Sequence, residues 1–474
     1  MRQIIPQTKV IVTLGPASSS EEIIYQMINE GVDVFRLNFS HSTQEEHLKL
    51  INIIKKLNQE LGTNVSILAD LQGPKLRVGE IDNNIYLTEG DIVTFVTEKC
   101  MGNKDHIYMS YQKFPQDVNL GESILIDDGK IKLEVIDTNK KDIVKARVIY
   151  GGPLFSRKGV NLPDTKVSLP SLTDEDISNA IFALDQDVDW IALSFVRKAA
   201  DITDLKNIIQ VKKGQPGIIA KIEKPEALLE IDKIIDLADG IMVARGDLGV
   251  EVPFDEVPLI QKLIVAKCIV QSKPVIIATQ MMESMITNFK PTRAEANDVA
   301  NAVLDGADAL MLSGETSVGK YPVETINCML RIIDYTENHG NPFNKDHIPV
   351  KRSTTFLADS ICYNAAKLAQ QVDAKAIIAF TNSGFTAIRI SSHRPKSVIY
   401  AFTNNIKILH NISLVWGIKP IYLDTYNSLD KAIPKSIEML RQRNLLTTGD
   451  CVIHLGSAPL NLIGSTNMLK VSTV

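Results

Sequence analysis

The chain has 474 residues, of which 45% are hydrophobic and 23% are charged, and its formal net charge at pH 7 is −5. By length it corresponds to about three domains of roughly 150 residues each, and its composition is typical of a globular protein with a large core. The slightly negative charge excludes a global basic field for nucleic acid or an anionic membrane, and no apolar run approaches the roughly 18 residues of a membrane span.

The five cysteines lie far apart in the chain and never form a C-x-x-C pair. They are Cys100, Cys268, Cys328, Cys362 and Cys451. An odd number at such spacings argues against a disulfide framework and against a zinc site. The first residues also lack the apolar core of a signal peptide. We therefore expect a cytoplasmic protein that binds neither nucleic acid nor membranes.

Eight short, apolar, β-rich runs recur along the chain, and helical segments follow most of them. The runs are 9–14, 32–37, 65–69, 190–195, 218–222, 241–244, 274–278 and 309–312. The helical segments include 20–30, 45–61, 174–184, 225–237, 257–271 and 293–304. Near-continuous apolar strands that alternate with helices indicate a parallel sheet covered by helices. Eight such units predict an α/β fold, a (β/α)8 TIM barrel.

About a hundred residues between the third and fourth runs lack this helical pattern. They contain β-like runs at 85–87, 92–96, 124–126, 131–135 and 143–149, with hairpin signals at 127–129 and 139–142. We predict a small all-β domain, here called the lid domain, inserted into the third loop of the barrel, where it could cover the site.

The polar stretch 338–342 and the residues after it predict a linker to a third domain. Beyond it, a helix at 358–371 precedes strands at 376–380, 398–402, 418–423 and 451–455, which alternate with helices. This pattern predicts a C-terminal α/β open-sheet domain. The expected boundaries are 1–73 and 167–345 for the barrel, 74–166 for the lid domain and 346–474 for the C-terminal domain.

Polar residues stand where each barrel strand is expected to end. They are Thr13, Arg36, Asn38, Asp70, Ser194, Lys221, Glu223, Arg245, Asp247, Thr279, Gln280, Ser313 and Glu315. Active sites of such barrels lie at the carboxyl ends of the strands. Ordinary caps and turns explain many of these residues one at a time. They do not explain two neighbouring strands that both end in a basic residue followed two positions later by an acidic one.

Glu223 and Asp247 together suit a hard divalent cation such as Mg²⁺, which binds one or two carboxylates and substrate oxygens. Lys221 adds a cation beside them, and with Arg36 it would clamp a phosphoryl group during transfer. Glycines such as Gly246 after a strand expose backbone N–H groups to an anion, although they also occur in simple turns. The alternative is a structural network of salt bridges. We predict a metal-dependent phosphoryl-transfer enzyme.

Six segments, taken together and in this order, resemble the pyruvate kinase family. They are RLNFSH at 36–41, KIE at 221–223, VARGDLG at 243–249, ATQMMES at 278–284, PTRAE at 291–295 and MLSGET at 311–316. Each segment alone is a weak signal, but their joint occurrence is highly specific. The resemblance covers essentially the whole chain from Thr8 onward and includes the predicted order of the domains.

The resemblance implies transfer of the phosphoryl group of phosphoenolpyruvate to ADP, which gives pyruvate and ATP in glycolysis. Lys221 would stabilise the phosphoryl group, Arg36 would contact it, and Glu223 and Asp247 would bind Mg²⁺ or Mn²⁺. The backbone at Gly246 and Asp247, with Thr279, would hold the carboxylate end of the substrate. We further hypothesise that a water relay through Thr279 and Ser313 protonates the enolate.

The nucleotide side of the site is also implied by this resemblance. Its residues would be Thr13, Pro16, Asn38, His41, Arg77 and, from the lid domain, Asp128 and Lys158. His41 has a second interpretation, since it could cap a helix that starts near Thr43.

The segment at 70–77 departs from the family pattern. The familiar form has threonine, lysine and glutamate at 71, 72 and 75, and binds K⁺ through the positions of Asn38, Ser40, Asp70 and the backbone at 71. Here these positions hold Leu71, Gln72 and Lys75. An ammonium has the charge of K⁺ and donates three hydrogen bonds, and the family contains a K⁺-independent branch with this substitution. We predict that Lys75 replaces K⁺; the alternative is a surface lysine near the hinge of the lid domain.

Lys224-Pro225 is a second departure, because the family usually has asparagine after Lys-Ile-Glu. Proline fits the first turn of a helix, so we expect the site to be intact.

The loop at 381–386 lies between a predicted strand and a predicted helix, where hydroxyls and free N–H groups suit a phosphate. Its residues are Thr381, Asn382, Ser383, Gly384 and Thr386. In the family this loop binds the phosphate of an effector. The run at 456–464 lacks the tryptophan and arginine associated with fructose 1,6-bisphosphate in animal forms. Fructose bisphosphate, another sugar phosphate and AMP therefore stay open, as does a simple helix-cap loop. By family analogy we expect a homotetramer.

The same set of charged strand ends is compatible with two other functions. A metal-dependent lyase or aldolase acting on an oxo-acid enolate would use the same paired carboxylates, but it needs neither the lid domain nor the nucleotide-side residues. A non-catalytic effector-binding scaffold has little reason to keep Lys221, Glu223, Asp247, Arg36 and Thr279.

Overall fold

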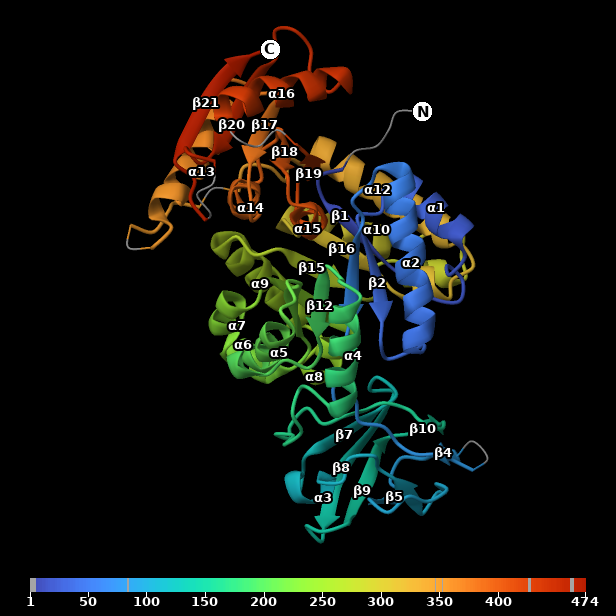
Figure 1. The fold of residues 1–474 in the computed structure, drawn as a ribbon. Helices are drawn as coiled ribbons and strands as arrows, with labels where there is room; N and C mark the ends of the chain where they lie inside the picture. The colour runs from blue at the N-terminus through green and yellow to red at the C-terminus, as the bar shows by residue number, and fades with distance from the viewer. Residues whose placement is uncertain (1–5, 83–84, 346, 352, 425–427, 461–463) are drawn as a thin grey trace.

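The computed structural model of the chain describes residues 6–82, 85–345, 347–351, 353–424, 428–460 and 464–474. A central barrel carries the inserted β domain at one end and the C-terminal domain at the other (Figure 1). Among the described residues, none of the helices has both the length and the apolar character that a membrane span requires.

The barrel closes from eight parallel strands in the order β1-β2-β3-β12-β13-β14-β15-β16. Their bounds are β1 Lys9–Thr13, β2 Val34–Asn38, β3 Ser66–Asp70, β12 Trp190–Leu193, β13 Gly217–Ile222, β14 Gly240–Ala244, β15 Val275–Ala278 and β16 Ala309–Leu312. Nearly every strand residue is buried, because side chains fill the barrel on one face and helices cover the other. All eight predicted strands and the TIM-barrel fold are confirmed.

The helices of the barrel form an outer ring around this sheet. Their bounds are α1 Glu21–Glu30, α2 Gln44–Leu61, α4 Asp174–Asp185, α5 Ala199–Lys212, α6 Pro225–Leu229, α7 Ile231–Leu237, α8 Arg245–Glu251, α9 Val257–Gln271, η1 Glu283–Ile286, α10 Arg293–Asp305, α11 Gly314–Ser317 and α12 Pro322–Gly340. The predicted helix 225–237 is wrong in one respect: it is divided into α6 and α7 at Glu230, whose φ and ψ of −112° and 16° are not helical.

One further expectation and one alternative interpretation need correction. The predicted linker begins too early, because α12 runs to Gly340 and ends at Asn341, which has a left-handed φ of 50° before Pro342. His41 does not cap α2. Thr43 does so, since its side chain accepts from the backbone N–H of Glu46 while the Glu46 carboxylate accepts from that of Thr43.

The inserted domain is almost entirely β. Its elements are β4 Ile85–Leu87, β5 Ile92–Val96, β6 His106–Tyr108, α3 Phe114–Asp117, β7 Ser123–Ile126, β8 Ile131–Thr138, β9 Ile143–Tyr150, β10 Gly152–Leu154 and β11 Val160–Asn161. A six-stranded sheet, β11-β7-β8-β9-β5-β6, is joined by the pair β10-β4. The domain has its own core, with Phe95 packed edge-on against Phe114. Asp127 and Asp128, at φ of 53° and 57°, make the turn from β7 to β8.

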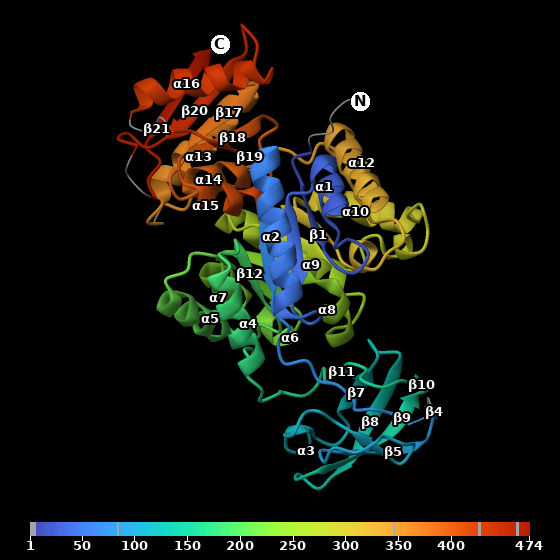
Figure 2. The same cartoon turned by 45° about the vertical axis from the view of Figure 1, so that its right-hand side comes forward.

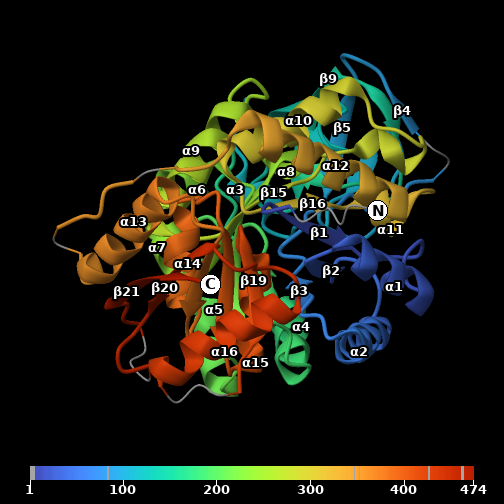
Figure 3. The ribbon, with the colours of Figure 1, turned by 90° about the horizontal axis from the view of Figure 1, so that it is seen from above.

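The C-terminal domain has one five-stranded sheet, in the order β19-β18-β17-β20-β21. Its elements are α13 Phe356–Gln371, β17 Ala376–Phe380, α14 Phe385–Ser392, β18 Val398–Thr403, α15 Ile406–Asn411, η2 Ile412–Leu414, β19 Ile418–Tyr422, α16 Leu429–Gln442, β20 Cys451–Gly456 and β21 Met468–Thr473. The predicted strands are confirmed, and β21 is an antiparallel edge strand that the sequence did not indicate. Figures 2 and 3 show this domain lying across the end of the barrel opposite the inserted domain.

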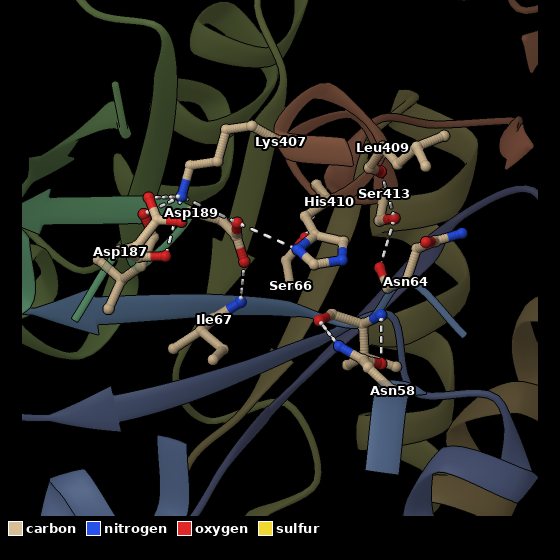
Figure 4. A network of polar contacts seen from close by, with 12 residues as sticks. Asn58, Asn64, Ser66, Ile67, Asp187, Asp189, Lys407, Leu409, His410 and Ser413 are labelled. Carbon is tan, nitrogen blue, oxygen red and sulfur yellow. Dashed lines mark hydrogen bonds and ion pairs between the residues drawn. The ribbon is translucent and has the colours of Figure 1, made fainter. Parts of the chain in front are cut away.

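Ion pairs and hydrogen bonds join the C-terminal domain to the barrel. Lys407 of α15 contacts Asp187 at 2.8 Å and Asp189 at 3.3 Å, at the start of β12 (Figure 4). Ser413 donates to the carbonyl of Asn64 at 2.7 Å. On the other side, Arg394 pairs with Asp308 at 2.7 Å, and both side chains are almost fully buried. The barrel strands therefore begin at the interface with the C-terminal domain and end at the side of the inserted domain.

Candidate active site

Strands β1, β2 and β3 bring the first cluster of polar side chains together at the carboxyl end of the barrel. Arg36 Nε lies 2.6 Å from Asp70 Oδ2, and Arg36 Nη1 donates to Thr13 Oγ1 at 3.0 Å. Thr13 in turn donates to the carbonyl of Leu312 at 2.8 Å. The Asp70 side chain is only 1% exposed. Arg36 is thus held by two strand ends in a buried position.

Lys221 on β13 is the centre of the site. Its Nζ lies 2.9 Å from Glu223 Oε1 and 3.2 Å from Asp70 Oδ1, and it donates to Ser194 Oγ at 2.6 Å. Lys221 and Glu223 point to the same side of the strand because side chains alternate with a period of two. Ser194 was only one of several strand ends in the sequence, and its contact with Lys221 was not predicted.

The charges of this cluster balance one another. Burial alone would lower the pKa of Lys221, but Asp70 and Glu223 outweigh it and raise that pKa well above its usual range. Burial would likewise raise the pKa of Asp70, but Lys221 and Arg36 hold it low. Burial raises the pKa of Glu223, as does the nearby Asp247, while Lys221 opposes the change. Lys221 therefore stays charged at neutral pH.

Glu223 and Asp247 are the carboxylates that fit a hard divalent cation. Glu223 is fixed by the backbone N–H of Phe195, which donates to its Oε2 at 2.8 Å. Within the described ranges, no group of three or more His, Cys, Asp or Glu side chains is arranged to hold a metal ion. Two carboxylates suffice for Mg²⁺ only when substrate oxygens and water complete its shell. The donor set therefore fits a cation bound jointly with an anionic substrate.

Thr279 lies at a strained turn after β15. Thr279 and Gln280 have left-handed φ angles of 67° and 54°, which costs about 1–3 kcal/mol for each such residue. Arg245 supports this turn, since its Nη2 donates to the Thr279 carbonyl at 2.9 Å and its guanidinium lies 2.7 Å from Asp298. The Thr279 hydroxyl accepts from the Gly246 N–H at 2.7 Å. Such strain indicates a turn selected for where it places these groups.

Ser313 stands at the end of β16. Its backbone N–H donates to Glu315 Oε2 at 2.7 Å. Its hydroxyl is buried, and among the described residues it has no hydrogen-bond partner. Buried hydroxyls almost always have a hydrogen-bond partner, so this one is an exception that a water molecule or a substrate oxygen would satisfy.

Cationic side chains gather near His41, on the side of the site where we predicted the nucleotide. Partial burial lowers the pKa of His41, and Lys75, Arg77 and Arg36 lower it further by their charges. Pro16 is exposed on the loop after β1, whereas Thr13 is buried with its hydroxyl already engaged. The structure thus brings His41, Lys75 and Arg77 near one another. Thr13 is buried and bonded to Arg36, so its side chain does not face the solvent beside them.

The inserted domain faces the same mouth. Lys158 Nζ lies 2.8 Å from Asp127 Oδ1. Burial would raise the pKa of Asp127, but Lys158 and Lys130 hold it low. Asp128 lines a cleft between the two domains together with Lys75 and Asp247.

The residues expected around a monovalent cation are only partly assembled. Asn38 Oδ1 accepts from the Ser40 N–H at 3.1 Å, and the Leu71 carbonyl accepts from Ser194 at 2.6 Å. Both oxygens of Asp70 face Arg36 or Lys221. Lys75 is exposed, and no ion pair to it is formed by any residue that the structure describes. The structure therefore does not place its ammonium on Asp70.

The loop at 381–386 is positioned between β17 and α14 as predicted. Asn382 Nδ2 donates to the Leu460 carbonyl at 2.7 Å, and the hydroxyls of Thr386 and Thr466 lie 2.8 Å apart. Ser383 is exposed, and Gly384 begins α14 at a φ of 83°. The N-terminus of α14 therefore has no side-chain cap, since its N-cap residue is a glycine. Part of the run at 456–464, residues 461–463, lies outside the described residues.

A (β/α)8 barrel whose strand ends hold a lysine and an arginine between buried carboxylates, beneath a β domain, defines a phosphotransferase. Family models match two parts of the chain: pyruvate kinase, barrel domain, over residues 5–326, and pyruvate kinase, alpha/beta domain, over residues 359–472. The chain belongs to the pyruvate kinase family.

Individual relatives agree with this assignment. The chain is 41% identical over 472 residues to a pyruvate kinase of Geobacillus stearothermophilus, covering 99% of this chain and 80% of that one. It is 40% identical over 469 residues to that of Mycobacterium intracellulare, covering 98% of each. A crystal structure of a pyruvate kinase from Cryptosporidium parvum superimposes with a TM-score of 0.91 at 34% identity, over 99% of this chain and 96% of that one. The phosphotransferase interpretation is confirmed, rather than the lyase or aldolase alternative.

Proposed function

We propose that the chain transfers the phosphoryl group of phosphoenolpyruvate to ADP, giving pyruvate and ATP in glycolysis. The observation that carries this proposal is Lys221, a charged lysine held between Asp70 and Glu223 at the mouth of the barrel. A fixed cation beside carboxylates that can share a metal is what stabilises a phosphoryl group as it moves between two oxygens.

Each residue has a defined task in this proposal. Arg36 and Lys221 bind the phosphoryl oxygens, and Asp70 keeps both cations in place. The backbone at Gly246 and Asp247, with the Thr279 hydroxyl, orients the carboxylate of the substrate. Glu223 and Asp247 would hold Mg²⁺ or Mn²⁺, which when bound supplies positive charge to the phosphoryl oxygens.

Protonation of the enolate needs a different group from Lys221. The raised pKa of Lys221 makes it a poor acid at neutral pH. We assign the proton to water held by Thr279 and Ser313, because the Ser313 hydroxyl is buried and unbonded within the described part of the chain. The nucleotide side of the proposed site consists of His41, Arg77, Asn38, Asp128, Lys158, Thr13 and Pro16. Of these, Thr13 acts through Arg36, which donates a hydrogen bond to its hydroxyl.

A direct assay tests this function. The purified chain should form pyruvate from phosphoenolpyruvate only when ADP is present, and a chelator should abolish the reaction until Mg²⁺ or Mn²⁺ is restored. Pyruvate formation at the same rate without ADP would contradict the proposal, as would no reaction with both substrates and metal.

We also propose that Lys75 removes the need for K⁺. Its exposed side chain lies at the hinge of the lid domain, so substrate binding would have to bring the ammonium toward Asp70 and Asn38. We expect full activity of the wild-type chain in buffer free of sodium and potassium. In Lys75→Glu, K⁺ should raise the rate at least tenfold, because the bound ion would replace the positive charge that the substitution removes. A wild-type rate below a few per cent of the K⁺ rate would refute the idea. Lys212→Met, at an exposed lysine, serves as the control.

The 381–386 loop is proposed to bind the phosphate of an effector, a sugar phosphate or AMP. Ser383→Glu places a carboxylate at the exposed start of α14 and should abolish activation by such compounds while basal activity stays unchanged. Thr448→Glu adds the same charge at another exposed position of the domain and should leave activation intact. Equal responses in the two variants would assign the loop to a simple helix start.

We further propose that the protein is cytoplasmic and forms a homotetramer. Sedimentation of the purified protein would test the number of subunits.

A further inference from the structure

The residue after the Lys-Ile-Glu segment departs from the family pattern, and the structure gives it a partner. Lys224 Nζ donates to Glu251 Oε1 at 2.6 Å. Glu251 is the last residue of α8, and its side chain is 1% exposed against 12% for Lys224. A carboxylate this deeply buried needs a cation or several donors, and Lys224 supplies a cation at hydrogen-bond distance.

The same carboxylate oxygen also joins the barrel to the inserted domain. Asn161 Nδ2 donates to Glu251 Oε1 at 2.7 Å, and Asn161 is the last residue of β11. The second oxygen of Glu251 is buried and accepts no hydrogen bond from any described residue. One oxygen therefore takes both donors, one from each domain.

This contact lies beside the proposed metal ligands. Lys224 directly follows Glu223, and Glu251 is four residues beyond Asp247, which is about one turn of helix α8. The turn between β7 and β8 reaches the same helix, since a Cβ at Gly129 would lie 3.9 Å from Cγ1 of Val250. Helix α8 is therefore the surface on which the inserted domain rests.

We propose that Glu251 is the latch that holds the lid domain on the barrel, and that Lys224 and Asn161 are positioning residues that set nucleotide affinity through it. Lys224 and Glu251 belong to the barrel and stay paired in any position of the lid domain. Asn161 joins them only when the domain is docked, by a hydrogen bond to a charged acceptor, a stronger type than a neutral one. This inference rests on the proposed function only for its kinetic readout.

The kinetic consequence follows from the docked fraction. A ligand that needs both domains binds with an apparent dissociation constant equal to the intrinsic constant divided by the docked fraction. A broken latch should therefore raise KM for ADP, which contacts Asp128 and Lys158 of the lid domain in our proposal. It should change kcat little, because the saturated complex is docked in either case.

The test places a carboxylate against the latch. Asn161→Asp should raise KM for ADP about tenfold, within the usual range of coupling between sites, with kcat within about twofold of wild type. Asn161→Asp combined with Glu251→Gln should return KM to within about threefold, because the glutamine amide can donate to the introduced carboxylate. Hydrogen exchange should rise in residues 157–162 and in α8 in the single variant and fall back in the double variant.

Asn119→Asp is the matched control. Asn119 also lies in the inserted domain and donates to a glutamate, Glu122 Oε1, at 2.8 Å, but this pair is exposed and within the domain. Its KM for ADP should stay unchanged. The latch is refuted if Asn161→Asp leaves KM within twofold, if Asn119→Asp raises it equally, or if the double variant is not rescued. A wild-type chain inactive on both substrates would refute the proposed function alone, and unchanged hydrogen exchange in Asn161→Asp would then still refute the latch.

Discussion

Replacing Lys221 by methionine should reduce kcat about a thousandfold, which is the scale of losing one preorganised charge at a transition state. Methionine has nearly the length of lysine but no charge, so the phosphoryl group would lose a cation that is held 2.9 Å from Glu223 and 3.2 Å from Asp70. Initial rates at saturating phosphoenolpyruvate and ADP measure the effect.

The same variant separates the two chemical roles at the site. If water at Thr279 and Ser313 protonates the enolate, Lys221→Met should still exchange the methyl protons of pyruvate with solvent, and Thr279→Ser should slow that exchange. The opposite pattern, with full exchange in Thr279→Ser and none in Lys221→Met, would make the lysine the proton donor. Lys212→Met, which removes an exposed lysine 3.5 Å from Asp185, should change neither reaction.

Replacing Arg394 by methionine should destabilise the chain by about 3–5 kcal/mol, the usual cost of breaking a buried ion pair from one side. Its Nη2 lies 2.7 Å from Asp308 Oδ2 and donates to the Gly306 carbonyl at 2.7 Å, and its guanidinium stacks 5.1 Å from the Trp416 ring. The variant would leave the Asp308 carboxylate buried at the foot of β16 with backbone donors alone.

Thermal unfolding followed by calorimetry measures this loss. Because a chain of several domains need not unfold in one step, the transition to compare is the one that separates the C-terminal domain from the barrel. The control is Arg157→Met, since Arg157 pairs with Glu80 at the surface and such pairs contribute roughly 0–1 kcal/mol. A shift for Arg394→Met no larger than that of the control would show that the pair does not hold the domains together.

The barrel was predictable because its strands are continuous apolar runs that end in polar residues. Burial on both faces of a parallel sheet imposes that pattern, so β13 and β14 could be located together with Lys221 and Asp247. Helix α12 was not among the helical segments named from the sequence, although Ile326, Met329, Leu330 and Ile333 are buried at helical spacing. Strand β21 has mostly exposed or half-buried residues, because it is an edge strand, and so it has no apolar run to detect.

The structure brings many of the predicted site residues to one end of the barrel, but the sequence did not predict the contacts between them. Asn161, Lys224 and Glu251 come from three distant parts of the chain, and no local pattern indicates that they meet on one oxygen. The position of Lys75 was equally hidden, since its identity suggested a cation on Asp70 whereas Arg36 and Lys221 already occupy both carboxylate oxygens. Burial and local periodicity are properties of segments, whereas such contacts are properties of the folded chain.

The two segments that lead into and out of the inserted domain leave the barrel from neighbouring strands. Residues of β3 and β12 pair directly, Leu68 with Trp190 and Asp70 with Ala192, so the barrel sheet closes without a strand from the inserted domain. The inserted domain has its own core around Phe95 and Phe114. Each of the two cores can therefore accept mutations with little effect on the stability of the other. Substrate preference can then change through the inserted domain, while Arg36, Lys221, Glu223 and Asp247 stay on an unchanged barrel.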